Sequence, residues 1–313
     1  MMIDKPGIYR EFDGEAYFAD PCPRASLSQS IAKILIDRSP LHAAMAHPRL
    51  REAVGALNDD DDAEKYVKAQ AIGNAAHKLM LGRGKDVDVI DLPDFKTKAA
   101  RELRDAASMA GRVPILTKHM IDATDMVESG RSQIKSHEAA DCFQNGDGEV
   151  ALIWQEKGIW FRCLVDWLHH DLLTVDDYKT GAVSVAPHVV GYRMVDQGWD
   201  IQAAMIERGL DALHPQTAGR RRYRFIAQEN DDPYALTVCQ LSESVMTMGR
   251  KKLQAAVDVW TRCLDRGEWP GYINRVISPE YPGFKENQWL EREVNEFSEP
   301  APRRPKLESL MGG

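Results

Sequence analysis

The stretch from Glu149 to Gly181 constrains the fold of this chain more than any other part of the sequence. It predicts three successive β-strands, because β-branched and aromatic residues fill three short runs and turn-forming residues separate them. The predicted strands are Glu149–Glu156, Ile159–Leu168 and Leu172–Lys179. Lys157-Gly158 and His169-His170-Asp171 supply the turns, and Thr180-Gly181 ends the third strand. We therefore expect a meander at the centre of the domain.

Side chains alternate between the two faces of a strand, so position along the strand assigns each residue to a face. In the third strand Asp177 and Lys179 share one face. Asp176 lies on the opposite face, where we expect a surface carboxylate away from the site. In the second strand Asp166 lies on the face of Arg162. The meander can thus bring Asp166 beside Asp177, with Lys179 one step further along.

Two carboxylates and an ammonium at the end of a sheet form a recognisable chemical set. The carboxylates can hold a hard divalent cation through their oxygens. The lysine can orient a water molecule or offset negative charge that builds up on a phosphate. The spacing therefore indicates a candidate metal site with phosphate chemistry.

Asp166, ten intervening residues and then Asp177-Tyr178-Lys179 resemble the D…(D/E)-x-K signature of the PD-(D/E)xK nuclease superfamily. The run from Arg162 to Leu168 is similar to the exonuclease VIII branch, whose relatives include the RecB and lambda exonuclease domains. D-x-K alone occurs by chance in many chains. Its position on a strand that follows a hairpin with another Asp strengthens the resemblance. Val165 stands where the superfamily name expects Pro.

Two helical blocks resemble further motifs of the same family. Gly73 and His77 lie four residues apart on one helical face and match the G-x-x-x-H motif, in which His lies near the metals. The block that contains Gln202 resembles G-Y-x-x-Q-x-x-x-Y, in which Gln lies close to the catalytic lysine. Trp199 replaces the first Tyr, and Ile206 stands where the last Tyr is expected.

Each helical residue also has a plain structural interpretation. A single His on an apolar helix is more often a core residue with satisfied hydrogen bonds, and this interpretation applies to His77. Gln202 can be an ordinary amide on a helix surface. From spacing alone, both interpretations stay open.

The resemblance covers roughly Ser26 to Tyr272. It implies an α/β, restriction-endonuclease-like core with a central mixed β-sheet flanked by α-helices. We accordingly expect three parts: an extended N-terminal segment (1–25), a nuclease domain (26–297) and a flexible C-terminal tail (298–313). Within the domain, Trp269-Pro270-Gly271-Tyr272 is expected to end the compact part.

The resemblance also implies which side chains bind metal. Asp166, Asp177 and the backbone carbonyl of Tyr178 would bind Mg²⁺, for which Mn²⁺ can substitute. His77 and Glu149 would complete the metal environment.

The implied reaction is hydrolysis of phosphodiester bonds from the ends of linear duplex DNA, in the 5′–3′ direction. Asp166 and Asp177 would act through the metal, Lys179 would position the attacking water, and Gln202 would hold Lys179 or the scissile phosphate. The resemblance further implies phage-type homologous recombination with a single-strand annealing partner. Several relatives form rings, so a homo-oligomeric ring is a further expectation.

Two other functions fit the same residues. One is a repair or sequence-specific endonuclease with the same core. The other is a DNA-binding relative that has lost its activity, in which the acidic and lysine positions should have decayed. Asp166, Asp177, Lys179, His77 and Gln202 are all present, which favours the enzyme.

The net charge of −8 argues mildly against a nucleic-acid partner. Nucleases can rely on local basic patches instead, and one such patch contains Arg220, Arg221, Arg222 and Arg224. A second is Arg250-Lys251-Lys252. We expect DNA to bind at the first patch.

The sequence shows no apolar run of the ~20 residues that span a bilayer and no signal-peptide core. The five cysteines are scattered without a C-x-x-C pair, so neither a zinc site nor a disulfide framework is indicated. We therefore expect a cytoplasmic protein of a bacterial or phage-infected cell, with no membrane partner.

Helix and strand signals fill the rest of the domain. Ser28 is a plausible N-cap of a helix that ends near Asp37, and this serine-rich opening resembles that of the exonuclease VIII-like domain. An acidic loop at Asn58–Asp62 precedes the helix Glu64–Leu81 that carries His77. Later elements are predicted as helices or strands at 86–92, 95–110, 113–116, 118–137, 187–196, 198–213, 222–228, 234–240 and 243–266.

Overall fold

The computed structural model describes residues 2–54 and 68–297. The chain divides into two compact units, Met1–Tyr272 and Ile273–Gly313. Three sequence predictions lie outside the described residues: the acidic loop Asn58–Asp62, the first turn of the helix Glu64–Leu81, and the tail 298–313.

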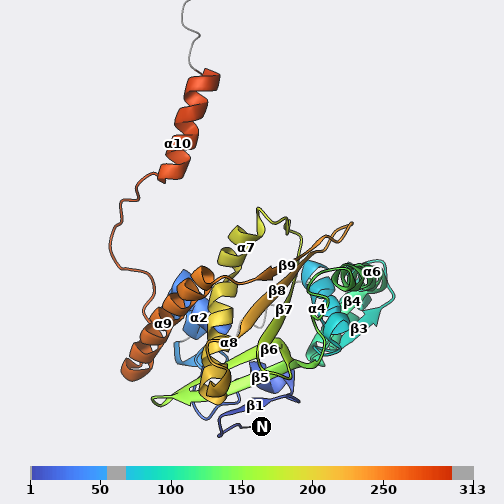
Figure 1. Ribbon diagram of the computed structural model, residues 1–313, viewed down its shortest axis with the longest axis horizontal. Helices are drawn as coiled ribbons and strands as arrows, with labels where there is room; N and C mark the ends of the chain where they lie inside the picture. Colours follow the sequence, from blue (N-terminus) through green and yellow to red (C-terminus); the bar gives the residue numbers. More distant parts are fainter. Residues whose placement is uncertain (1, 55–67, 298–313) are drawn as a thin grey trace, which may run out of the picture. The chain divides into compact units, whose positions relative to one another are not determined.

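A mixed sheet forms the centre of the first unit (Figure 1). The predicted meander is confirmed as β5 (Gly146–Glu156), β6 (Ile159–His169) and β7 (Thr174–Gly181), paired antiparallel in sequence. The strand order is β1-β5-β6-β7-β8-β9, with β2 pairing β6. The other strands of this sheet are β1 (Gly7–Tyr9), β2 (Leu27–Ser28), β8 (Arg222–Glu229) and β9 (Leu236–Gln240). Because β8 runs parallel to β7, the sheet is mixed, as predicted.

One face of this sheet is covered by helices from both halves of the unit (Figure 1). Apolar side chains of β5, β6 and β8 pack there against these helices in the largest core, which includes Trp154, Phe161, Trp199 and Trp260. The elements on this side are α2 (Gln29–Asp37), α3 (Pro40–Ala46), α7 (Val190–Gln197), α8 (Trp199–Leu213) and α9 (Glu243–Arg266). The short helical turns η1 (Glu52–Val54) and η2 (Pro215–Thr217) lie between elements.

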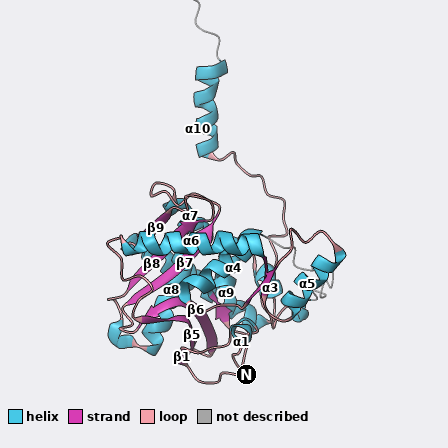
Figure 2. Ribbon diagram, turned by 90° about the vertical axis from the view of Figure 1, so that its right-hand side faces the viewer, coloured by secondary structure: helices cyan, strands magenta, loops and turns pink. Residues whose placement is uncertain are grey.

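The other face is covered by α4 (Lys68–Leu81) and α6 (Thr117–Lys135), and Figure 2 shows α6 lying across the strands. Tyr178 and Ile226 of the sheet pack into this second core. A small parallel sheet of β3 (Val87–Ile90) and β4 (Val113–Leu116) adjoins these helices, with α5 (Lys98–Met109) between its strands in sequence. No helix among residues 2–54 and 68–297 is long and apolar enough to cross a bilayer.

Strand β6 exchanges one partner for another along its length, and this exchange opens the sheet. Near its carboxyl end β6 pairs with β7, at Trp167 and Leu168. Near its amino end the same edge pairs with β2, at Phe161 and Arg162. Between these contacts none of the strands described is registered with β6 on that edge, and Asp166 lies at this opening.

The N-terminal segment is part of the first unit. Its strand β1 pairs antiparallel with β5, and Ile3 and Cys22 pack against Ile153 and Trp160. It also contains a short helix, α1 (Gly14–Phe18), with Asp13 as N-cap. The unit ends at Tyr272, where the sequence indicated the end of the compact part. The second unit contains α10 (Gly283–Arg292) and the π-helical turn η3 (Glu293–Phe297).

Candidate active site

Helix α4 places His77 beside the opened sheet because a glycine one turn earlier lets it approach β7. A Cβ added to Gly73 would lie 2.9 Å from the Thr180 hydroxyl oxygen, closer than such contacts normally are. The spacing of Gly73 and His77 therefore has a direct packing reason. The glycine brings helix and strand together, and the imidazole then reaches β6.

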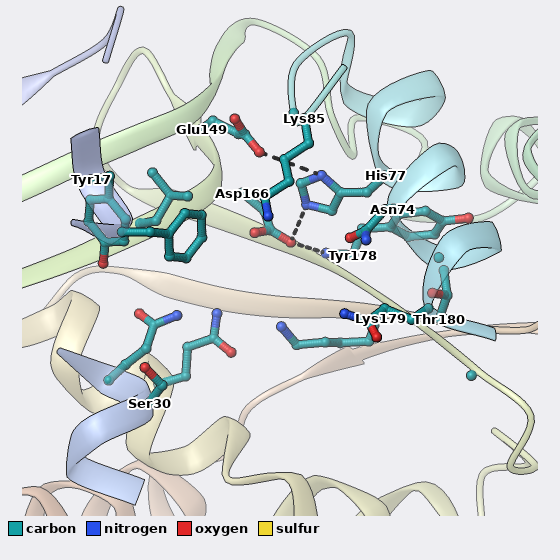
Figure 3. Close-up of a pocket in the computed structure, with 18 of the residues that line it drawn as sticks. Tyr17, Ser30, Asn74, His77, Lys85, Glu149, Asp166, Tyr178, Lys179 and Thr180 are labelled. Atoms are coloured by element: carbon teal, nitrogen blue, oxygen red, sulfur yellow. Dashed lines mark hydrogen bonds and ion pairs between the residues drawn. The ribbon is translucent and has the colours of Figure 1, made fainter. Parts of the chain in front are cut away.

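Asp166 is the central acceptor of this region. His77 Nε2 lies 3.1 Å from Asp166 Oδ2, and the Tyr178 backbone N–H donates to the same oxygen over 3.0 Å. On its other side, His77 Nδ1 lies 3.8 Å from Glu149 Oε1. Figure 3 shows Glu149, His77 and Asp166 joined in this order and Asp166 joined to Tyr178. The Asp166 side chain takes the backbone donor that a regular β-ladder would have used, which keeps β6 and β7 apart here.

Asp177 is the second carboxylate, and it is buried on the face that the alternation predicted. It forms an ion pair with Lys179 through Oδ1. The Gln202 side-chain amide donates to Oδ2 of Asp177. Gln202 therefore fixes the second carboxylate, whereas the resemblance implied a contact with Lys179 or the phosphate.

Glu149 faces the same region through a strained backbone. Its φ is +52°, in the left-handed region that a non-glycine residue rarely adopts, at a cost of roughly 1–3 kcal/mol. Its neighbours Gly148 and Val150 stay in register with Trp167 and Val165, so Glu149 interrupts the β5–β6 ladder opposite Asp166. Strain of this kind is tolerated where surrounding contacts hold the side chain in place.

The two aspartates respond in opposite ways to their surroundings. Burial opposes the ionisation of Asp166, but the charge and hydrogen bond of His77 and the charge of Lys179 outweigh it and lower its pKa. Burial and the charge of Asp166 raise the pKa of Asp177, against the attraction of Lys179. The negative charges of Asp177 and Asp166 raise the pKa of Lys179 against its burial, so the ammonium form is favoured. Asp166 thus disfavours the ionisation of Asp177, and a divalent cation would relieve this repulsion.

The donor atoms suit a hard divalent cation. Asp177 Oδ1 is buried and has no hydrogen bond of good geometry, only the Lys179 ion pair, so it retains acceptor capacity. The N–H and C=O of one residue in an extended strand point to the same side, so the Tyr178 carbonyl faces the gap beside Asp166. Carboxylate and carbonyl oxygens are the ligands of Mg²⁺ and Ca²⁺. Within the described part of the chain no three His, Cys, Asp or Glu side chains already converge on one point.

A cavity of about 640 Å³ lies in front of these groups. Figure 3 shows Ser30 and Lys179 along one side of it, with Glu149, His77 and Asp166 on the other. The start of α2 lines the cavity at Ser28–Ser30, and Ser28 caps this helix by accepting from the Ile31 N–H. The cavity therefore combines carboxylates suited to a metal ion, Asp166 and Glu149, with the Lys179 ammonium and a helix N-terminus.

The profile of the family described as a PDDEXK-like domain of unknown function (DUF3799) matches residues 51–277. The chain belongs to this family. The matched range contains every residue named above as a possible metal ligand, and it excludes β1, α1, β2, α2 and α3.

A solved structure shares this fold at low sequence identity. A candidate exonuclease from Eubacterium rectale is 11% identical with a TM-score of 0.52, covering 88% of this chain and 98% of that protein. LHK-Exo in complex with dAMP is 13% identical and covers 64% of this chain and 96% of that one, but its TM-score of 0.24 is too low to carry an argument. Among curated proteins, none matches this chain. The restriction-endonuclease-like α/β architecture predicted from the sequence is confirmed.

The basic patch at and just before the start of β8 does not line this cavity. Arg224 is buried and bonds to Asp176 and Asp141, and the nearly buried Arg221 side chain pairs with Asp211. Arg220 and Arg222 are exposed, and neither lines the cavity. Arg221 and Arg224 therefore stabilise the fold, and the patch does not offer four free cations to DNA.

Asp176 is on the face opposite Asp177, as predicted, but the expectation of a surface carboxylate is wrong. It is fully buried and accepts hydrogen bonds from the Phe143 backbone over 3.0 Å, from His169 over 2.8 Å and from Arg224 over 2.6 and 2.9 Å. Asp176 is covered by the loop that carries Phe143, between α6 and β5, rather than by solvent. Alternation assigns a face, but it does not say what covers that face.

The two positions at which the family pattern expects tyrosines hold core residues in this domain. Trp199 stacks on Phe225 with ring centroids 5.0 Å apart, and Ile206 is buried in the same core. These positions supply packing, and Gln202 is the polar residue of its block that reaches the site.

Sequence reasoning missed several side chains that line the cavity. Tyr17 and Phe18 come from α1, and Lys85 comes from the connection after α4. Arg162 was assigned to the correct face but was given no role, although it also lines the cavity. The aromatic pair before a serine-rich helix start was the available signal for α1.

Proposed function

We propose that this PDDEXK-like domain is a nuclease that hydrolyses phosphodiester bonds of DNA with the help of a divalent metal ion. The observation that carries the proposal is the convergence of Asp166, Asp177 and Lys179 at the opening between β6 and β7, with His77 and Glu149 beside them. These groups come from three strands and a helix, and the cavity in front of them is open to a substrate.

Asp166, Asp177 and the Tyr178 carbonyl would hold the metal, and His77 and Glu149 would complete its surroundings. A bound Mg²⁺ or Mn²⁺ would neutralise charge on the scissile phosphate and favour deprotonation of the attacking water.

Lys179 acts as a cation in this proposal. Its raised pKa favours the ammonium form, which can orient a water molecule or offset charge on a phosphate but cannot accept a proton. Gln202 keeps the Asp177 carboxylate in one orientation by donating to Oδ2. Preorganisation of this kind reduces the reorganisation required when negative charge develops.

The finer proposal is an exonuclease that digests linear duplex DNA from its ends in the 5′–3′ direction, within phage-type recombination. It is supported by the resemblance to the exonuclease VIII branch and by a structural neighbour described as a candidate exonuclease. A single-strand annealing partner and a ring-shaped oligomer belong to the same proposal.

One assay tests the proposal and its main alternative together. End-labelled linear duplex and a covalently closed circle of the same sequence are incubated with the protein in Mg²⁺, in Mn²⁺ and in excess chelator. We expect the linear DNA to be shortened from its ends in either metal, and the chelator to stop the reaction. Equal cleavage in chelator would refute the metal-dependent mechanism, and equally fast cutting of the circle would identify an endonuclease.

A further inference from the structure

Phe18 stands out among the cavity residues because it is apolar and yet exposed. Its side chain is 54% exposed and lines both the main cavity and a neighbouring cavity of about 300 Å³. Phe18, Gly84, Lys85 and Glu149 line both hollows, so the two adjoin at this point. The Phe18 ring is therefore accessible to a ligand from either hollow.

The structure holds Phe18 on a rigid support. Tyr17 beside it is buried, its ring meets that of Phe18 edge to face at 5.3 Å, and the Arg162 guanidinium lies 5.5 Å from the Tyr17 ring centre. Two residues further on, the buried Asp20 pairs with Arg162 at 3.1 Å and accepts two hydrogen bonds from Ser26. The phenyl ring is therefore presented from an anchored turn.

Lys85 lies over this ring. Its Nζ is 5.7 Å from the centre of the Phe18 ring, and the side chain is exposed. No carboxylate of the described residues lies within ion-pair distance of Lys85. Figure 3 shows Lys85 reaching into the cavity between Tyr17 and His77. Glu149, a carboxylate that lines both hollows, is engaged with His77.

An aromatic face next to a cation matches the two parts of a nucleotide. Nucleobases stack on aromatic side chains without regard to sequence, and lysines contact the phosphates. In the interior of a duplex both faces of each base are already covered by its neighbours, so an exposed phenyl ring can stack only on an unpaired or frayed base.

We propose that Phe18 and Lys85 form a subsite for an unpaired nucleotide of the DNA strand, with the base stacked on Phe18 and a phosphate bound by Lys85. Glu149 lies both in this subsite and next to His77 of the candidate metal site. The subsite therefore takes a nucleotide that flanks the scissile bond. This inference rests on the proposed nuclease function and deepens it, because it assigns single-stranded DNA ends to the same cavity. It also gives a role to α1, which lies outside the range matched by the family.

The test uses the full-length protein, chelator to prevent hydrolysis, and a short single strand that carries the fluorescent base 2-aminopurine near its end. Stacking quenches this fluorophore, so one titration reports both affinity and stacking. We expect Phe18→Ala to weaken binding by about 5- to 150-fold and to abolish the quenching. Phe18→Trp should restore both. Tyr192→Ala is the control, because Tyr192 is 79% exposed on α7 and lines neither cavity.

Lys85→Ala tests the phosphate contact separately. The slope of log affinity against log salt concentration should fall by about 0.7, the value for one phosphate contact with a single strand. Lys157→Ala, at the exposed β5–β6 turn, should leave the slope unchanged.

The outcomes separate this inference from the proposed function. If the wild type cleaves DNA but Phe18→Ala binds and quenches like the wild type, the subsite is refuted and the nuclease proposal stands. If the wild type neither cleaves DNA in Mg²⁺ or Mn²⁺ nor binds the single strand, the proposed function itself fails. A wild type that binds the strand without quenching also refutes the stacking contact.

Discussion

Asp176→Asn should lower the melting temperature and spare metal binding, whereas Asp177→Asn should abolish cleavage and spare the melting temperature. The two residues are adjacent, and both changes remove one charge with almost no change of shape. The expected difference follows from what each carboxylate contacts. Asp176 belongs to a buried network of the fold, and Asp177 belongs to the candidate metal site.

For Asp176 the magnitude follows from four donors. The Phe143 N–H, His169 Nε2 and two nitrogens of Arg224 converge on its two oxygens, and an asparagine can offer only one acceptor oxygen to them. Breaking a buried ion pair costs about 3–5 kcal/mol. Arg224 keeps a hydrogen bond to Asp141 at 2.7 Å, so the loss of unfolding free energy should lie near the lower end of this range, at about 3 kcal/mol. At about 2–4 °C per kcal/mol for a domain of this size, the melting temperature should fall by roughly 6–12 °C.

For Asp177 the free energy of unfolding should change little. Burial and the charge of Asp166 already oppose its ionisation, so removing the charge relieves repulsion while the Lys179 ion pair is lost. We expect a melting temperature within about 2 °C of the wild type, which corresponds to less than about 1 kcal/mol. Cleavage should fall by at least about 100-fold, as expected when one electrostatic contact to a transition state is removed.

Thermal unfolding by circular dichroism, Mn²⁺ binding by calorimetry and cleavage of labelled duplex measure the three quantities. Cleavage and calorimetry are run well below the melting temperature of the less stable variant. Asp176→Asn should then bind Mn²⁺ and keep most of its activity. The reasoning is refuted if Asp176→Asn melts like the wild type, or if Asp177→Asn remains active while Asp176→Asn is inactive although folded.

Three further changes test other parts of the structure. Gly73→Ala should reduce cleavage and lower the free energy of unfolding by about 1–3 kcal/mol, because the Thr180 side chain or α4 itself must shift to make room for the added methyl group. Gly191→Ala, in the open face of α7, should be neutral or stabilising in the same denaturant titrations. Glu149→Gly should relieve left-handed strain and raise the free energy of unfolding by about 1 kcal/mol, yet weaken Mn²⁺ binding in calorimetry. The pKa of Asp20 is pushed up by burial, but the His47 hydrogen bond and the charge of Arg162 outweigh this and lower it. Its stabilising effect is therefore complete above about pH 4 and is lost as the pH falls further, so melting curves of Asp20→Asn should lie well below the wild type at pH 7 and converge with it in acid.

The strands and the faces of their side chains follow from the sequence, because alternation and turn chemistry are local. A strand places every second side chain on one face wherever it lies in the fold, and for this reason Asp177 and Lys179 point to the same face. The cap at Ser28 is equally local, since its hydroxyl needs only the N–H three residues later. The resemblance added the identity of the site, since it named His77 and Gln202 from motif positions.

The contacts of buried side chains could not be predicted in the same way, because they depend on which distant segments pack against them. A run of arginines looks like a DNA-binding patch until Asp176 and Asp141 are found beside Arg224. Asp176 likewise looks like a surface carboxylate until the loop that carries Phe143 covers it. Neither partner is close in sequence, so no local pattern records these contacts.

The sequence by itself thus determined the meander, the alternation that selects Asp177 over Asp176, and the family to which the chain belongs. The tertiary structure alone decided that Glu149 turns into the site through a strained backbone, that Gln202 holds Asp177, and that α1 brings Phe18 to the cavity. The physical reason is the range of the interactions. Strand alternation and capping are set within a few residues, whereas a site built where one strand exchanges its partners exists only after all the layers have packed.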